Sequence, residues 1–248
     1  MIKIKSLHEI QKMRAAGRIV AETFEVLRPN IVPGITTLEL DKIAAEHIKK
    51  SGAACSFYNY SGYPGHICIS VNDEVIHGIP GKRVLNVGDI VSVDVGACIE
   101  GYHGDAARTF AVGEILPEAE KLISVTEESF YEGIKYAQPG YRLGDISANI
   151  QAIVEKNGFS VVRDYIGHGI GSALHEDPEV PNFGTAGRGP RLVPGMTIAV
   201  EPMVNIGTFK VNTLSDDWTV VTADGKLSAH YENTILITNN GAEILTKC

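Results

Sequence analysis

The chain repeats one plan of secondary structure twice, and this repeat limits its fold more than any other feature of the sequence. In the first half, an amphipathic helix pattern, the turn Pro33-Gly34 and a second helix pattern precede strand-like runs. Pro139-Gly140 matches that turn at an offset of 106 residues, and Lys156-Asn157-Gly158 matches Lys50-Ser51-Gly52 at the same offset. The period is too long for a solenoid, so the pattern indicates two α/β halves related by a pseudo-twofold axis.

A carboxylate inside an apolar strand run is the third repeated landmark. Gly88 and Asp94 are matched by Gly195 and Glu201 at an offset of 107 residues. Binding sites favour the junctions between packed units. We therefore expect these two carboxylates to face each other where the halves meet.

The domain organisation expected from this repeat is simple. No low-complexity stretch divides the chain, so we expect residues 1–248 to form a single domain with internal halves near 1–112 and 113–248. The expected class is mixed α/β (α+β).

The run from Val91 to Asp105 predicts a hairpin that holds two carboxylates together. Glu100-Gly101 suits a two-residue turn, which pairs Gly96 with Asp105 and leaves Asp94 on the same face as Gly96. The two aspartates are then diagonal neighbours about 7 Å apart, and Gly96 is expected to leave space for cations beside them. Carboxylates so close need either a shared proton or cations to offset their charge.

Net charge and cysteine usage narrow the partners and the compartment. The chain has 22 Lys and Arg against 30 Asp and Glu, a net charge of −8, which argues against nucleic acid or an anionic membrane as the main partner. The four cysteines form no CxxC pair and are expected to be free thiols in a reducing compartment. Because no signal-peptide core or apolar run of transmembrane length occurs, we expect a cytoplasmic protein. We also expect the protein to be a monomer.

Four carboxylates and one histidine form a candidate metal-binding set. Asp94, Glu201 and Glu232 each interrupt an apolar strand run, Asp105 ends the hairpin, and His168 lies in a glycine-rich loop. A lone carboxylate in a strand usually faces solvent, but four of them with a histidine are oxygen-rich ligands without the thiolates of a structural zinc site. Their four negative charges balance two divalent cations, which favours metals over a shared proton.

These residues and their neighbours resemble the type I methionine aminopeptidases over almost the whole chain. The matching segments are Gly78-Ile79, the Asp94-x10-Asp105 pair, Gly167-His168-Gly169-Ile170-Gly171, Val200-Glu201-Pro202-Met203 and Tyr231-Glu232-Asn233-Thr234. The short interval from His168 to Glu201 fits type I rather than type II. The resemblance implies the duplicated pita-bread fold, in which a curved, largely antiparallel sheet is flanked by two pairs of helices. It also implies removal of the initiator methionine from nascent proteins and peptides when the second residue is small.

The resemblance also implies a role for each site residue. Two divalent ions (Fe, Mn or Co) would be held by Asp94, Asp105, His168, Glu201 and Glu232, and a hydroxide on them would attack the first peptide carbonyl. Glu201 would shuttle the proton, His175 would stabilise the oxyanion and His77 would hold the leaving group. The methionine pocket would be lined by His77, His175, Phe57, Tyr60, Tyr63, Cys68, Leu174 and Trp218.

Two departures from the family pattern and two alternative functions stay open at this stage. Leu174 replaces a phenylalanine common in bacterial members, and His230 replaces a common glutamine, where it either supports Glu232 or points at solvent. Asn72 and Ser228 match positions that hold a monovalent cation in relatives. The alternatives are a Xaa-Pro peptidase of the same fold and a non-catalytic pita-bread scaffold; the identity of the metal and a transient ribosome contact are also open.

Overall fold

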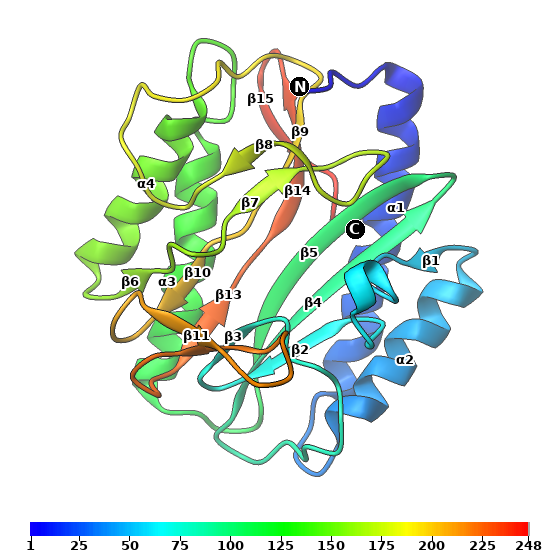
Figure 1. Cartoon of the computed structure of the whole chain (residues 1–248), viewed down its shortest axis with the longest axis vertical. Coiled ribbons are helices and arrows are strands. Elements are labelled where there is room, and N and C mark those ends of the chain that lie inside the picture. The colour runs from blue at the N-terminus through cyan, green and yellow to red at the C-terminus, as the bar shows by residue number, and fades with distance from the viewer. Residues whose placement is uncertain (248) are drawn as a thin grey trace.

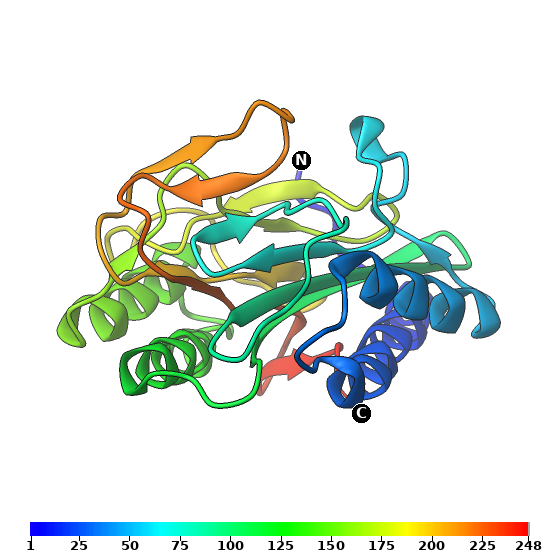
Figure 2. The ribbon, with the colours of Figure 1, turned by 90° about the horizontal axis from the view of Figure 1, so that it is seen from below.

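Two helix pairs lie beside a set of antiparallel strands in the computed structural model, which describes residues 1–247 (Figure 1). The helices are α1 (Leu7–Leu27), α2 (Thr37–Lys50), α3 (Pro117–Ile134) and α4 (Leu143–Lys156), with short 3₁₀ turns η1 (Arg28–Asn30) and η2 (Tyr60–Gly62). Figure 2 shows the helices along one side of the strands. The helix pairs therefore cover one face and leave the other for loops and short strands.

Every strand pairing is antiparallel, as expected for this class. In the first half, β4 pairs with β1, β2 and β5; in the second, the orders are β15-β14-β9-β7-β8 and β13-β10-β6, and β11-β12-β3 joins the two. The strands are β1 (Ala54–Cys55), β2 (Cys68–Val71), β3 (Glu74–Ile76), β4 (Ile90–Ile99), β5 (Tyr102–Ala111), β6 (Ser160–Val161), β7 (Gly167–Gly169), β8 (Glu176–Val180), β9 (Thr197–Val200), β10 (Met203–Asn205), β11 (Val211–Thr213), β12 (Val220–Thr222), β13 (Ser228–His230), β14 (Asn233–Thr238) and β15 (Gly241–Ile244).

Local sequence explains where the helices begin. Ser6 caps α1 and Thr36 caps α2, each in a reciprocal capping box with the glutamate three residues later. The third helix begins at Pro117. Proline fits the first helical turn because its missing N–H would have no intrahelical partner there.

The predicted repeat is visible in the backbone. Gly34 and Gly140 have φ angles of 97° and 98°, and Gly88 and Gly195 have 97° and 89°. These left-handed conformations favour glycine over any residue with a Cβ atom. The same turn therefore precedes the second helix of each pair, and the same turn precedes each carboxylate-bearing strand.

The hairpin of the first half has a counterpart made of shorter strands. Gly96 pairs with Asp105 between β4 and β5, as predicted, and Met203 pairs with His230 between β10 and β13. In this register β9 and β10 together correspond to β4, while β13 and β14 together correspond to β5. The break falls at Glu201-Pro202, where proline has no N–H for a continuous ladder.

Two threonines join the halves in a symmetric way. The Thr234 hydroxyl accepts from the Asp105 N–H at 3.0 Å and donates to the Asp105 carbonyl at 2.9 Å. The Thr109 hydroxyl makes the same two bonds with the His230 backbone, both at 2.9 Å. The pseudo-twofold axis therefore runs between β5 and the β13–β14 segment, and it relates Asp105 to His230.

Near the C-terminus the strand arrangement differs from the expected one. The sequence suggested strand runs over 218–222 and 230–238 with Asp224-Gly225 as the turn between them. In the structure β12 pairs with β11 and β3, whereas β14 pairs with β9 and β15. The residues between the two runs are used by β13, which pairs with β10, so no direct hairpin forms.

The described cysteines agree with the thiol prediction. Cys55, Cys68 and Cys98 are free, and Cys248 lies outside the described residues. Within residues 1–247, no helix combines the length and apolar character needed to cross a membrane.

Candidate active site

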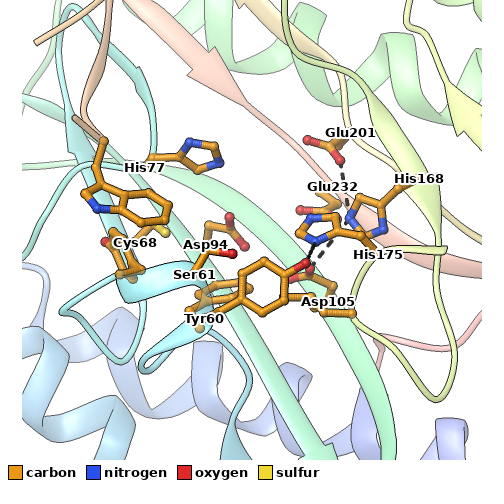
Figure 3. A pocket seen from close by; sticks show the side chains of 14 residues that line it. Tyr60, Ser61, Cys68, His77, Asp94, Asp105, His168, His175, Glu201 and Glu232 are labelled. Carbon is orange, nitrogen blue, oxygen red and sulfur yellow. Dashed lines mark hydrogen bonds and ion pairs between the residues drawn. The ribbon is translucent and has the colours of Figure 1, made fainter.

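Five oxygen and nitrogen donors meet where the two halves join (Figure 3). The first half supplies Asp94 from β4 and Asp105 from β5, and the second supplies His168 from β7, Glu201 directly after β9 and Glu232 directly before β14. The labelled side chains point into one common space. Residues predicted from three separate strand runs and a loop are thus brought together by the fold.

The histidine of this cluster has a defined orientation. His168 Nδ1 donates to the carbonyl of Gly169 at 2.9 Å, which leaves the Nε2 lone pair directed at the carboxylates. Nε2 lies 3.9 Å from Asp105 Oδ2 and 3.7 Å from Glu201 Oε1. These separations are too long for hydrogen bonds but suit atoms that share one cation.

Burial makes the charges of the carboxylates costly. Desolvation, and next the neighbouring carboxylates, raise the pKa of Asp94, Glu201 and Glu232 well above the usual range. Burial also raises the pKa of Asp105, to about 7. Without a compensating charge the cluster would hold protons, so its ionised form requires cations.

The donors fit divalent cations. Among the described residues, Asp94 Oδ1, Asp105 Oδ1 and Glu232 Oε1 are buried and have no hydrogen-bond partner, although buried polar atoms are normally paired. One donor atom each from Asp105, His168 and Glu232 lies within 4.8 Å of the others. Hard oxygen donors with one imidazole bind a range of divalent ions.

A cavity of about 190 Å³ adjoins the donors. Its wall is largely apolar and aromatic, as in pockets that hold an apolar side chain. It is bordered by the five donors and by Phe57, Tyr60, Ser61, Tyr63, Cys68, His77, Leu174, His175 and Trp218. All residues expected to line a methionine pocket lie around this one space, and Ser61, which the sequence did not single out, joins them.

Two further histidines lie on opposite sides of the carboxylates (Figure 3). The His175 Nδ1 atom lies 2.6 Å from the Tyr60 hydroxyl, and its ring centroid is 4.2 Å from that of His168. His77 follows β3 with a left-handed φ of 58°, an uncommon conformation that functional sites often retain. Burial and, next, His175 lower the pKa of His77 to about 4, so it is neutral near pH 7.

Gly96 does not have the expected role. A Cβ atom there would lie 2.7 Å from the Phe57 ring and 2.8 Å from Ser56 Cβ. The space beside Asp105 is thus filled by these two side chains rather than left for cations. Gly96 lets Phe57 reach the cavity, and the expectation that it makes room for metal is wrong.

His230 is the site residue whose place the sequence left open. Its side chain is 2% exposed, so the alternative in which it points at solvent is wrong. Its Nε2 atom lies 3.8 Å from Glu201 Oε2 and 3.9 Å from Glu232 Oε2. The sequence signals for this position were its place two residues before Glu232 on a strand and its replacement of a glutamine common in the family.

The two residues considered for a monovalent cation are in contact. The Ser228 N–H donates to the Asn72 carbonyl at 2.9 Å, and the Asn72 amide donates to Asp89 Oδ1 at 2.8 Å. Asn72 has a left-handed φ of 62°. Carbonyl oxygens with one acceptor position in use still have a second lone pair.

Comparison with known proteins gives consistent results over the whole chain. Residues 11–239 match metallopeptidase family M24. The methionine aminopeptidase of Clostridium perfringens is 61% identical over 246 residues, 99% of each chain. The crystal structure of the methionine aminopeptidase from Thermotoga maritima superposes with a TM-score of 0.99 at 51% identity and covers both chains completely. The Pyrococcus furiosus prolidase, at 24% identity and a TM-score of 0.80, shares the fold over 99% of this chain and 65% of its own.

Proposed function

The chain belongs to metallopeptidase family M24 and within it to the methionine aminopeptidases, and from that premise we propose that it removes the N-terminal methionine of nascent proteins and peptides whose second residue is small. It has the pita-bread fold of its relatives. The observation that carries the proposal is the cavity, which is lined both by aromatic side chains and by the buried donor cluster. A single apolar side chain fits such a pocket while the peptide bond next to it lies at the donors.

The donor cluster would hold two divalent ions. Asp94 and Asp105 would bind one, His168 and Glu201 the other, and Asp105 and Glu232 would bridge them. Bound there, the ions would activate water and polarise the first peptide carbonyl. Fe, Mn and Co are the candidate metals, because this donor set does not select among them.

Three side chains would handle protons and orient the peptide. Glu201 would accept a proton from the attacking water and pass it to the leaving nitrogen. His175, oriented by Tyr60, would donate a hydrogen bond to the carbonyl oxygen as negative charge develops on it. His77, on the other side of the carboxylates, would hold the nitrogen of the scissile bond.

The pocket wall would select the methionine side chain. Phe57, Tyr63 and Leu174 are at most 8% exposed and pack in one cluster with Cys68 and, at its edge, Trp218. A flexible thioether suits this aromatic and thiol lining, and each misfitting methylene would cost about 1–3 kcal/mol. Leu174 is the residue through which this chain would differ from bacterial relatives that carry phenylalanine.

The remaining parts of the proposal concern context. We place the activity in the cytoplasm, in a monomer whose 248 residues form a single catalytic domain with halves near 1–112 and 113–248. A monovalent cation beside Asn72 and Ser228, and a transient contact with the ribosome, complete the proposal. The contact between the Ser228 N–H and the Asn72 carbonyl supports the cation position.

Peptide hydrolysis tests the function directly. The protein, purified without oxygen and loaded with Mn, Co or Fe, should release methionine from Met-Ala-Ser and leave Xaa-Pro peptides intact. Preferential cleavage before proline would support the prolidase alternative. Absence of methionine release with every metal would support a binding scaffold. Metal content measured on the same samples identifies which ion accompanies activity.

A further inference from the structure

We propose that His230 is a sixth protein donor of the metal centre and contributes its Nε2 atom on the side of Glu201 opposite His168. The inference rests on the proposed metal-dependent function and deepens it. It adds a nitrogen donor to the five ligands that the family resemblance implies.

The first support is a match of distances within the same centre. His168 Nε2 lies 3.7 and 3.9 Å from carboxylate oxygens of Glu201 and Asp105. His230 Nε2 lies 3.8 and 3.9 Å from carboxylate oxygens of Glu201 and Glu232. The two imidazoles address different oxygens of Glu201, Oε1 and Oε2. The distances from the His230 Nε2 atom to its neighbouring carboxylate oxygens therefore match those of the expected ligand His168.

The second support is the pseudo-twofold axis. His230 occupies the register position that Asp105 occupies in the first half, and Asp105 is an expected bridging ligand. Thr109 holds the His230 backbone as Thr234 holds that of Asp105. The scaffold thus delivers both side chains to the same centre from opposite directions.

The third support is the absence of another partner for this nitrogen. Within the described residues, His230 Nε2 is buried and has no hydrogen bond, although buried polar atoms are normally paired. A donor atom from each of Glu201, His230 and Glu232 lies within 4.8 Å of the other two. A cation is the partner that satisfies an imidazole nitrogen and two carboxylate oxygens at once.

The competing explanation is a hydrogen bond from His230 to Glu201 outside the metal. Such a bond requires a nitrogen–oxygen distance of about 2.7–3.2 Å, and neither carboxylate is that close. A glutamine amide could serve that purpose equally well, whereas glutamine replaces imidazole poorly as a ligand. His230→Gln therefore separates the two explanations.

The deciding measurement counts imidazoles bound to the metal. Proton NMR of the intact Co(II)-loaded protein reports each cobalt-bound imidazole as a strongly shifted, solvent-exchangeable N–H resonance. We expect two such resonances in the wild-type protein and one in His230→Gln. His103→Gln is the matched control, because His103 lies outside the donor cluster, with its Nδ1 atom 2.9 Å from the Ser56 hydroxyl. This variant should retain both resonances. Titration calorimetry with Co(II) should show at least about tenfold weaker binding of one ion in His230→Gln.

Two results would overturn the inference: a single shifted imidazole resonance in the wild-type protein, or an unchanged pair in His230→Gln. The wild-type count decides the question even if the variant fails to fold. A protein with two resonances that releases no methionine would contradict the proposed function and leave this inference intact. Methionine release by a protein with one resonance would support the proposed function and contradict this inference.

Discussion

The two halves of the molecule share a scaffold but differ in their site residues. Each half has a helix pair, a glycine turn before the second helix and a glycine turn before the acidic strand. In the first half β4 and β5 run unbroken, whereas their counterparts are interrupted at Glu201-Pro202 and Tyr231-Glu232. The helix pairs and the turns thus keep the repeat, while the strands of the second half are interrupted where the donors lie.

The register shows what changed at the site. Asp94 and Glu201 are both acids, Asp105 corresponds to His230, and Ala107 corresponds to Glu232. The backbones of Ala107 and Glu232 form two hydrogen bonds across the axis. The Ala107 N–H donates to the Glu232 carbonyl at 3.3 Å, and the Glu232 N–H donates to the Ala107 carbonyl at 2.9 Å. Because alanine is small, Glu232 can lie over the axis without a second carboxylate opposite it. A symmetric scaffold therefore supports an asymmetric centre.

The largest expected effect is at Asp105, the donor of the first half that both cations would share. Asp105→Asn keeps the side-chain size but removes the negative charge between the ions. Methionine release from Met-Ala-Ser should fall at least about 10³-fold, equivalent to about 4 kcal/mol of transition-state stabilisation. Full metal content with activity retained would contradict the bridging role.

The paired threonines allow a matched comparison of the halves. Thr234→Val removes the hydroxyl that fixes Asp105, and should lower activity about 10–100-fold by misorienting a donor. Thr109→Val removes the equivalent hydroxyl at His230, and should lower activity less, about tenfold or below. Each change should cost about 1–2 kcal/mol of folding stability. Equal activity losses, measured with saturating metal, would contradict the asymmetry.

A substitution at Gly96 tests whether this residue shapes the pocket or the metal site. Its counterpart in the second half is Met203, so a side chain is tolerated there but not at Gly96. Gly96→Val should push Phe57 into the cavity and raise KM for Met-Ala-Ser about tenfold. Bound metal, measured after dialysis, should not change. Loss of metal with an unchanged KM would instead support the expectation from the sequence that Gly96 leaves space for cations.

The smallest expected effect is on the stability of the metal-free protein, to which each half contributes two carboxylates. Their folded-state pKa values are raised, so the stability they confer is present at low pH and is lost as pH rises through the folded values, about 7 for Asp105. His77 and His168, with pKa values lowered to about 4 and 3, destabilise the fold only as pH falls below their ordinary range near 6.5.

A thermal scan can separate these contributions. Between about pH 7.5 and 8.5 the histidines with lowered pKa values are neutral in both the folded and the unfolded protein, while the buried carboxylates still lose protons on unfolding. Tm of the chelator-treated protein should therefore fall by several degrees over this interval, at about 2–4 °C per kcal/mol. Added divalent metal should remove this slope, because it keeps the carboxylates ionised in the folded state. A Tm of the metal-free protein that rises over this interval would contradict the raised pKa values.

The sequence alone was sufficient for features that depend on local pattern. The turn glycines and the register of the hairpin at Gly96 and Asp105 were predicted from short-range rules and are confirmed. The repeat also predicted that Asp94 and Glu201 meet, because binding sites favour the junction between packed units.

Features that depend on contacts between distant segments were decided only by the tertiary structure. The space beside Gly96 is filled by Phe57, which local pairing rules cannot reveal. His230 is buried against Glu201 because β13 pairs with β10 rather than with the preceding strand run. Periodicity assigns a side chain to one face of a strand, but the segment packed against that face determines whether it meets water, a hydrophobic core or a cluster of carboxylates.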